Sequence, residues 1–220
     1  MRDVLRDPDI PQDASVAIEY HLPQSGKRID FVITGQAENR VDHAVLIELK
    51  QWSSVQLSDK DAFVYTPFFG EVVHPSYQAW SYASLLQGFN ATVYEENIQL
   101  KPCAYLHNYR EDEVIRAERY LPYVEKAPLF LEGDDEKEKL QAFIKRFVKY
   151  GDKTKILDRI DSGKIRPSKE LAESLYKMLS GNQEFVLVDD QKLAYETALA
   201  LIRRGSKDDK HVLIIQGGPG

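Results

Sequence analysis

The sequence predicts an α/β protein whose mixed central sheet is flanked by helices. Two short apolar runs rich in β-branched residues, 28–33 and 45–50, are typical of strands. Apolar residues recur at helical spacing between residues 140 and 148, and a second helical stretch opens at Pro75. Strands and helices therefore mix along the chain, which favours an α/β fold over an all-helical or all-strand one.

The composition is that of an ordinary folded protein. Of the 220 residues 43% are hydrophobic, and the formal net charge is −6. No apolar stretch reaches the length of a membrane span, and residues 1–8 lack the apolar core of a signal peptide. The single cysteine, Cys103, excludes an intrachain disulfide and a cysteine-rich zinc site. We therefore expect a cytoplasmic protein with no membrane partner; the acidic charge argues against a generally basic nucleic-acid coat protein.

We expect a first domain in residues 1–132. The local pattern predicts its elements in this order: a helix over 13–20, strands over 28–33 and 45–50, a strand pair or a loop over 57–70, a helix from Pro75 to about Gln87, and strands over 101–109 and 127–131. Asp13 is the expected N-cap of the first helix, and Glu19 lies near its end. Gly88 is the expected end of the second helix.

A helical connector is expected over residues 133–181. The charged run 132–139 marks the boundary before it, and we interpret this run as a solvated helix start at the surface. The apolar positions that follow recur at helical spacing: Leu140, Phe143, Ile144, Phe147 and Val148. Further helices are expected over 156–160 and 168–179, with Gly181 ending the last one.

Residues 182–220 have the pattern expected at the start of a nucleotide-binding domain. An apolar run over 185–188 precedes a helix with four residues on one face, Leu193, Ala194, Ala198 and Leu201. Residues 211–215 are a continuous apolar run, typical of a strand in a parallel sheet. The next residues match the first four positions of the phosphate-binding loop G-x-x-x-x-G-K-[ST], namely Gly217, Gly218, Pro219 and Gly220. We expect a chain cut inside this loop; the alternative is an ordinary flexible terminus.

Two carboxylates and a lysine form the main candidate site. Asp30 and Glu48 lie on the two acid-bearing strands, which a turn-rich stretch joins, so adjacent strands could bring them to one edge of the sheet. Lys50 follows Glu48 by two residues and therefore shares its strand face. Mg²⁺ is held in proteins by one or two carboxylates and takes waters and phosphate oxygens as its other ligands. The pattern predicts a metal site suited to phosphodiester hydrolysis.

Three more residues are candidates for the same site, each with an alternative interpretation. Glu19 could add a third carboxylate near the metal, or could be a solvated surface glutamate. Gln78 and Tyr82 are four residues apart, so they share a helix face on which they could hold a nucleic-acid backbone. Tyr82 also belongs to an apolar stripe that is typical of an ordinary helix core.

The order of these residues resembles the PD-(D/E)xK nuclease superfamily, and the Gln-x-x-x-Tyr element is similar to its RecB-like branch. The resemblance covers about residues 10–110 and implies a restriction-endonuclease-like fold. It implies that Asp30 and Glu48 bind Mg²⁺ or Mn²⁺, that Lys50 acts on the attacking water or the scissile phosphate, and that Glu19 is an accessory acid. Gln78 and Tyr82 would position the substrate. The sequence departs from the superfamily's name in one place, because the residue before Asp30 is isoleucine and not proline.

The segment 185–220 is similar to the start of a superfamily 1 helicase ATPase. There Gln191 would contact adenine, and residues 217–220 would open the Walker A loop. The combination resembles bacterial proteins in which a nuclease-like N-terminus is fused to a Schlafen group 3-like DNA/RNA helicase domain. ATP would then bind only the full-length protein, and we expect no ATP hydrolysis by this chain, which lacks the loop's lysine.

We therefore expect a metal-dependent nuclease that cuts DNA and is joined to a helicase motor, with a role in DNA repair or in defence against foreign DNA. Two alternatives stay open. The first is a nuclease-fold module that binds nucleic acid or a partner without cutting. The second is an RNase, which would use the same chemistry.

Overall fold

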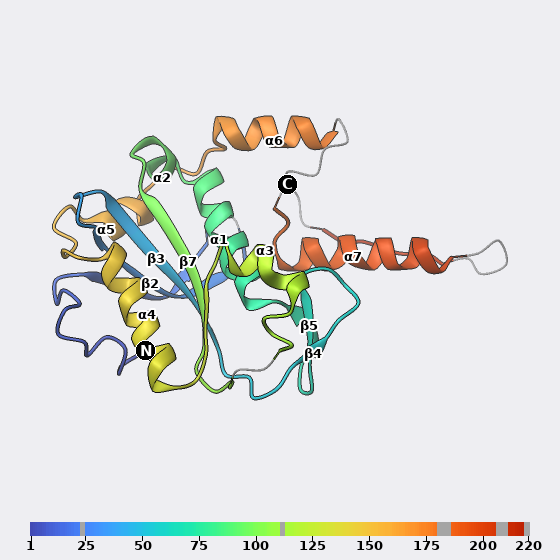
Figure 1. Ribbon diagram of the computed structural model, residues 1–220. Helices are drawn as coiled ribbons and strands as arrows, with labels where there is room; N and C mark the ends of the chain where they lie inside the picture. Colours follow the sequence, from blue (N-terminus) through green and yellow to red (C-terminus); the bar gives the residue numbers. More distant parts are fainter. Residues whose placement is uncertain (23–24, 111–112, 180–185, 206–210, 218–220) are drawn as a thin grey trace.

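The computed structural model describes residues 1–22, 25–110, 113–179, 186–205 and 211–217 (Figure 1). The strands are β1 (Ser15–His21), β2 (Arg28–Gln36), β3 (Asp42–Lys50), β4 (Gln56–Leu57), β5 (Phe63–Thr66), β6 (Gly70–Val73), β7 (Gln99–Leu106) and β8 (Leu129–Phe130). The helices are α1 (Pro75–Phe89), α2 (Ala91–Glu95), α3 (Leu121–Val124), α4 (Asp134–Phe147), α5 (Ile156–Asp161), α6 (Lys169–Leu179) and α7 (Asp189–Arg204), with a 3₁₀ turn at Glu118–Tyr120.

Five of the described strands form a mixed sheet in the order β1-β2-β3-β7-β8. β2 is antiparallel to both β1 and β3, whereas β7 is parallel to β3 and β8 is parallel to β7. Helices cover the sheet, with α1 on one side and α4 on the other (Figure 1). The predicted α/β architecture with a mixed sheet is confirmed. A second, small sheet consists of β4, β5 and β6, so the stretch 57–70 forms strands and not a loop.

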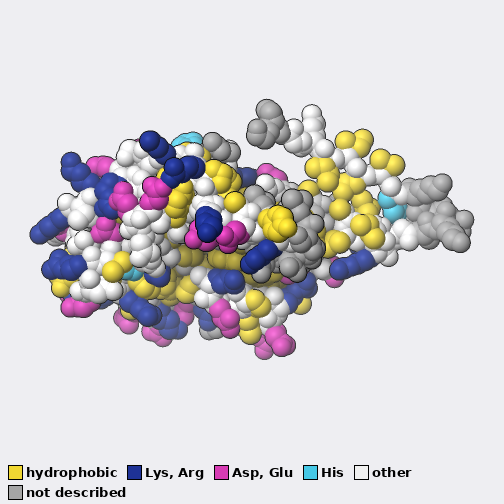
Figure 2. All heavy atoms as spheres, turned by 90° about the horizontal axis from the view of Figure 1, so that it is seen from above, with side chains coloured by type: hydrophobic (Ala, Val, Ile, Leu, Met, Phe, Trp, Pro, Cys, Tyr) yellow, Lys and Arg dark blue, Asp and Glu magenta, His cyan; other side chains and the backbone are white. Residues whose placement is uncertain are grey.

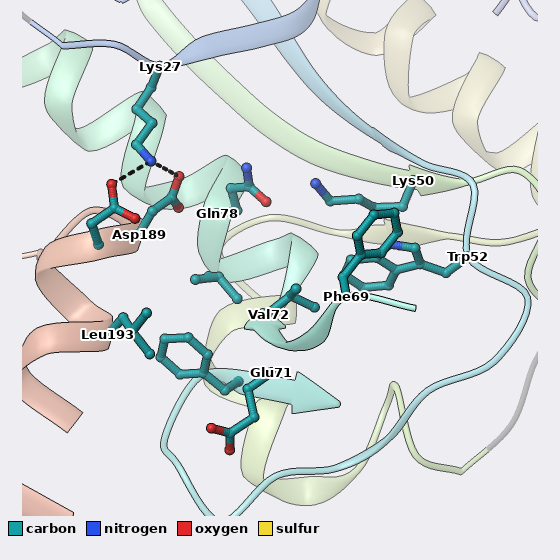
Figure 3. Close-up of a pocket in the computed structure, with 12 residues that line it drawn as sticks. Lys27, Lys50, Trp52, Phe69, Glu71, Val72, Gln78, Asp189 and Leu193 are labelled. Carbon is teal, nitrogen blue, oxygen red and sulfur yellow. Dashed lines mark hydrogen bonds and ion pairs between the residues drawn. The ribbon is translucent and has the colours of Figure 1, made fainter. Parts of the chain in front are cut away.

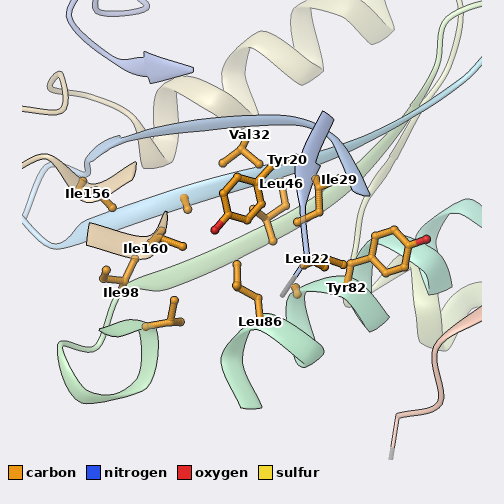
Figure 4. Packing of buried hydrophobic residues seen from close by; sticks show 13 residues of the cluster. Tyr20, Leu22, Ile29, Val32, Leu46, Tyr82, Leu86, Ile98, Ile156 and Ile160 are labelled. Carbon is orange, nitrogen blue, oxygen red and sulfur yellow. The ribbon is translucent and has the colours of Figure 1, made fainter. Parts of the chain in front are cut away.

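The central strands are apolar throughout because both of their faces are buried. Val32 and Leu46 lie in the cluster on the α1 side, which Figure 4 shows from close by. Ile33 and Ile47, one residue further along each strand, lie in the cluster on the α4 side. Successive side chains of a strand point to opposite faces, so a strand between two helical layers needs apolar residues at consecutive positions. This explains the two runs that predict β2 and β3.

Part of the expected connector packs directly on the sheet. In α4, Leu140 and Ile144 are fully buried in the cluster beneath that helix. In α5, Ile156 and Ile160 join the cluster on the opposite face of the sheet. These two helices therefore belong to the same core as the strands. α6 forms as predicted, and Gly181, its expected end, lies outside the described residues.

The predicted helix over residues 13–20 is wrong, because this stretch forms strand β1. It pairs with β2 in a hairpin, which supplies the backbone hydrogen bonds that the β-branched and aromatic side chains of the segment favour. Within the ladder Ile18 is opposite Phe31 and Tyr20 is opposite Ile29, whereas Glu19 between them has a positive φ of 51°. The expected N-cap at Asp13 is therefore not formed, and Glu19 lies on an edge strand.

Helix α1 begins at Pro75 as predicted, and the residue before it explains why. His74 is the N-cap, and its ring nitrogen Nδ1 accepts a hydrogen bond from the Ser76 backbone N–H at 3.2 Å. The helix continues past Gly88 to Phe89, so the predicted end is two residues too early. Asn90 ends α1 and caps α2 with its side chain, which accepts from the Val93 N–H.

The C-terminal part agrees with the prediction only for its helix. α7 spans the four apolar positions expected on one face. The strand expected over 211–215 is not formed: residues 211–217 are exposed and have no regular structure, because no described strand lies beside them to share backbone hydrogen bonds. Figure 2 shows hydrophobic side chains gathered where this part projects, and charges of both signs intermingled over the body. Phe185 and residues 218–220 lie outside the described residues.

Candidate active site

Strands β2 and β3 bring Asp30 and Glu48 together at one end of the sheet. Phe31 pairs with Ile47 in the antiparallel ladder, and the next rung places Asp30 opposite Glu48. The Asp30 carboxylate accepts a hydrogen bond from the Leu49 backbone N–H, with 2.7 Å between Oδ2 and N. Both acids lie on the face of the sheet that α1 covers, since they share strand parity with the residues packed there. The predicted juxtaposition is therefore present.

Glu48 is a buried carboxylate with one unpaired oxygen. The residue is 3% exposed, and its Oε1 accepts a hydrogen bond from Lys50 Nζ at 2.6 Å. Its Oε2 is buried and has no hydrogen-bond partner. Burial raises the pKa of Glu48 to about 7, and the negative charges of Asp30 and Asp189 add to this effect, while Lys50 opposes it. A carboxylate with so perturbed a pKa beside a cleft is typical of a functional site.

Helix α1 carries Gln78 and Tyr82 to the same place. The two side chains meet as their spacing predicts: Gln78 Nε2 donates to the Tyr82 hydroxyl at 3.0 Å. The Tyr82 hydroxyl in turn donates to Oδ2 of Asp189 at the start of α7. The ring of Tyr82 is packed in the core cluster, as one of its two interpretations predicts (Figure 4), while its hydroxyl faces Asp189. Its contact with a nucleic-acid backbone stays a prediction.

A pocket of about 420 Å³ opens beside these residues (Figure 3). Lys50 and Gln78 line it, together with Trp52, whose ring centroid lies 5.5 Å from Lys50 Nζ. Among the lining residues that the sequence did not single out as site residues, two contact each other. Lys27 extends from the turn before β2, and Asp189 comes from α7. No local pattern marks either one, because the contact between them joins segments far apart in the chain.

Glu19 lies on the neighbouring edge strand, and its carboxylate is paired with Arg28. The distance between Glu19 Oε2 and Arg28 Nη1 is 2.6 Å, and the Glu19 side chain is mostly exposed. Glu19 is therefore one strand away from Asp30, and its carboxylate forms an ion pair with Arg28 at the surface. Its role as an accessory acid stays a prediction.

The donor set fits a hard divalent cation that takes few protein ligands. Within the described ranges, no three His, Cys, Asp or Glu side chains come together as a metal site. Two carboxylates, with waters and substrate oxygens completing the shell, are the usual arrangement for Mg²⁺. The unpaired Oε2 of Glu48 is an acceptor in need of a positive partner. Asp30 and Glu48 are thus suitable ligands.

The residues expected to bind nucleotide are not assembled in the described part of the chain. The Gln191 side chain caps its own helix, since its Oε1 accepts from the Val188 N–H at 3.2 Å. Gly217 is exposed, and the three residues after it are outside the described ranges. The nucleotide site stays a prediction.

Comparison with known proteins adds no family to this picture: no family model, no curated protein and no solved structure matches the chain. None of the helices in the described ranges combines the length and apolar character that crossing a bilayer demands.

Proposed function

We propose that this chain is a metal-dependent nuclease domain that hydrolyses phosphodiester bonds, with DNA as the expected substrate. The observation that carries this proposal is the buried, unpaired Oε2 of Glu48 beside Asp30 and Lys50. An unsatisfied buried carboxylate oxygen costs about 1–3 kcal/mol or more of stability. A protein keeps a group that destabilises its fold mainly where function requires that group.

Each residue of the site has a defined task in this proposal. Asp30 and Glu48 would hold Mg²⁺ or Mn²⁺, which when bound would polarise the phosphate and acidify a water molecule. The hydrogen bond from the Leu49 N–H fixes the Asp30 carboxylate in place. Lys50 points along the same face and would orient the water or offset charge on the scissile phosphate. Gln78 and Tyr82 would hold the neighbouring backbone.

The wider context is proposed on the sequence resemblance. Glu19 would act as an accessory acid. Residues 182–220 would begin a P-loop helicase domain related to the Schlafen group 3-like helicases, and α7 is its described helix. In a full-length nuclease–helicase, ATP-driven movement would feed a strand to the site, and roles in DNA repair or in defence against foreign DNA would follow.

Cleavage of labelled single- and double-stranded DNA and RNA in Mg²⁺ or Mn²⁺ tests the proposal. Parallel reactions contain EDTA, or use the Glu48→Ala and Lys50→Ala variants. Glu138→Ala and Lys153→Ala are matched controls, because both residues are exposed and lie outside the pocket. We expect cutting that is lost in EDTA and in both site variants and is retained in both controls.

Three results would contradict this proposal. Absence of cutting by a folded chain that binds no Mn²⁺ in calorimetry would favour the module that binds without cutting. Cutting confined to RNA would replace the DNA nuclease with the RNase. Cutting that survives Glu48→Ala would move the active site elsewhere.

A further inference from the structure

Asp189 binds Tyr82, which is expected to hold substrate, and Lys27 at the pocket wall. Its Oδ2 accepts the hydrogen bond of the Tyr82 hydroxyl and lies 3.4 Å from Lys27 Nζ. The Asp189 side chain is only 13% exposed, although it belongs to the first turn of a helix at the far end of the sequence. Figure 3 shows Lys27 reaching down to this carboxylate at the pocket wall. A carboxylate from elsewhere in the chain therefore occupies the pocket.

The donors around Asp189 are arranged to receive an anion. Gln78 donates to the Tyr82 oxygen, so the single hydroxyl hydrogen of Tyr82 is directed to Asp189. Burial lowers the pKa of Lys27, but its hydrogen bond to Asp190 and the charges of both aspartates outweigh this and raise the pKa. Lys27 is thus a cation at neutral pH. The Lys27 ammonium group and the Tyr82 hydroxyl therefore both face Oδ2 of Asp189.

This anion position adjoins the candidate metal ligands. The charge of Asp189 contributes to the raised pKa of Glu48, and the same pocket contains Lys50. The second oxygen of Asp189, Oδ1, is buried and has no hydrogen-bond partner, so the carboxylate is only partly hydrogen-bonded in this position. A phosphodiester carries two non-bridging oxygens and a full negative charge, which suits donors of this kind.

We propose that Lys27, Gln78 and Tyr82 form a phosphate subsite for the nucleic-acid strand, and that Asp189 fills this subsite when no strand is bound. Substrate would displace the carboxylate and move the first turn of α7 out of the pocket. The inference rests on the proposed function for the identity of its ligand, but it concerns binding and not cleavage. It adds Lys27 to the substrate-binding residues and makes Asp189 an internal competitor.

Other contacts hold α7 in place independently of Asp189. The Tyr77 hydroxyl donates to the Leu187 carbonyl at 2.7 Å. Further along the helix, Lys192 Nζ lies 2.7 Å from Oδ2 of Asp61, which is outside α7. A substitution of Asp189 alone therefore empties the subsite without detaching the helix, which makes a point variant a clean test.

Binding of a fluorescein-labelled oligothymidylate of about 20 nucleotides, followed by anisotropy in EDTA, measures the subsite without cutting. We expect Asp189→Ala to bind about tenfold more tightly than the unmodified chain, because a hydrogen bond to a charged group no longer has to be broken. Lys27→Ala should bind more weakly. Asp190→Ala is the matched control: Asp190 also pairs with Lys27, at 2.8 Å, but its side chain is 84% exposed.

The outcomes separate this inference from the proposed function. Asp189→Ala binding no tighter than Asp190→Ala would overturn the subsite, even if the chain cuts DNA. Loss of Mn²⁺ binding in Asp189→Ala would also overturn it, since Asp189 would then be a metal ligand. Tighter binding by Asp189→Ala in a chain that never cuts would support the subsite and contradict the nuclease.

Discussion

His74 makes the folding of the site-bearing helix sensitive to acid. The imidazole is fully buried, with Nε2 2.9 Å from the Ile115 carbonyl oxygen and Nδ1 accepting from the Ser76 N–H. Nε2 therefore carries the proton in the neutral ring, and Nδ1 must stay unprotonated to cap α1. Burial lowers the pKa of His74 from 6.5 to about 4, against a small opposing effect of the Ile115 carbonyl.

The size of the effect follows from that shift. The fall from 6.5 to about 4, at about 1.4 kcal/mol for each unit of pKa, corresponds to about 3 kcal/mol. Because the pKa of His74 is lower in the folded chain, the unfolded chain binds the proton first as the pH falls. The contribution to stability is therefore complete above pH 6.5 and is lost between pH 6.5 and about 4.

Urea unfolding from about pH 7.5 to about pH 5 measures this loss. The unmodified chain should lose about 2 kcal/mol more over that range than His74→Asn, since asparagine keeps an N-cap acceptor but does not titrate. His21→Asn, a substitution at an exposed position of β1, should leave the pH dependence unchanged. Equal slopes for the unmodified chain and His74→Asn would refute the assignment of acid sensitivity to His74.

Three further predictions test the site and the core. Glu48→Gln should abolish Mn²⁺ binding in calorimetry and raise the melting temperature of the metal-free chain, because it removes a buried charge; a lower melting temperature would contradict this. Gly35→Ala should lower the free energy of unfolding by about 1–3 kcal/mol, since a Cβ there would lie 2.6 Å from Val148 Cγ1 and still closer to the Tyr150 carbonyl. Leu140→Ala should cost about 2–5 kcal/mol in urea unfolding if α4 belongs to the core, and almost nothing if α4 is a loose connector.

The parts of the fold that sequence could predict are those with a strong local pattern. β2 and β3 could be predicted because consecutive buried positions produce an unbroken apolar run, and α1 could be predicted from its opening proline and its periodic apolar face. β1 was missed because its apolar residues do not alternate regularly with polar ones, so a short helix fits the same pattern. Pairing with β2 makes this segment a strand, and such pairing is a tertiary effect that the local sequence does not show.

The candidate site divides in the same way. The meeting of Asp30 with Glu48 could be expected from two acid-bearing strands joined by a short connection, and the Gln78–Tyr82 contact follows from helix geometry. Lys27 and Asp189 could not be expected, because a turn lysine and the first acid of a helix are ordinary residues until folding places them together. Likewise, the apolar stripe of α4 predicts a helix but not the surface that it covers.

The positive φ of Glu19 has a consequence for the behaviour of this protein at high concentration. β1 is an outer strand of the sheet, and Ile18 on it is 73% exposed. A straight apolar edge offers backbone donors and acceptors to a second molecule and is a template for aggregation. The left-handed backbone at Glu19 interrupts the regular ladder between Ile18 and Tyr20. With the charged pair of Glu19 and Arg28 at that interruption, we expect the edge to be protected against intermolecular β-pairing.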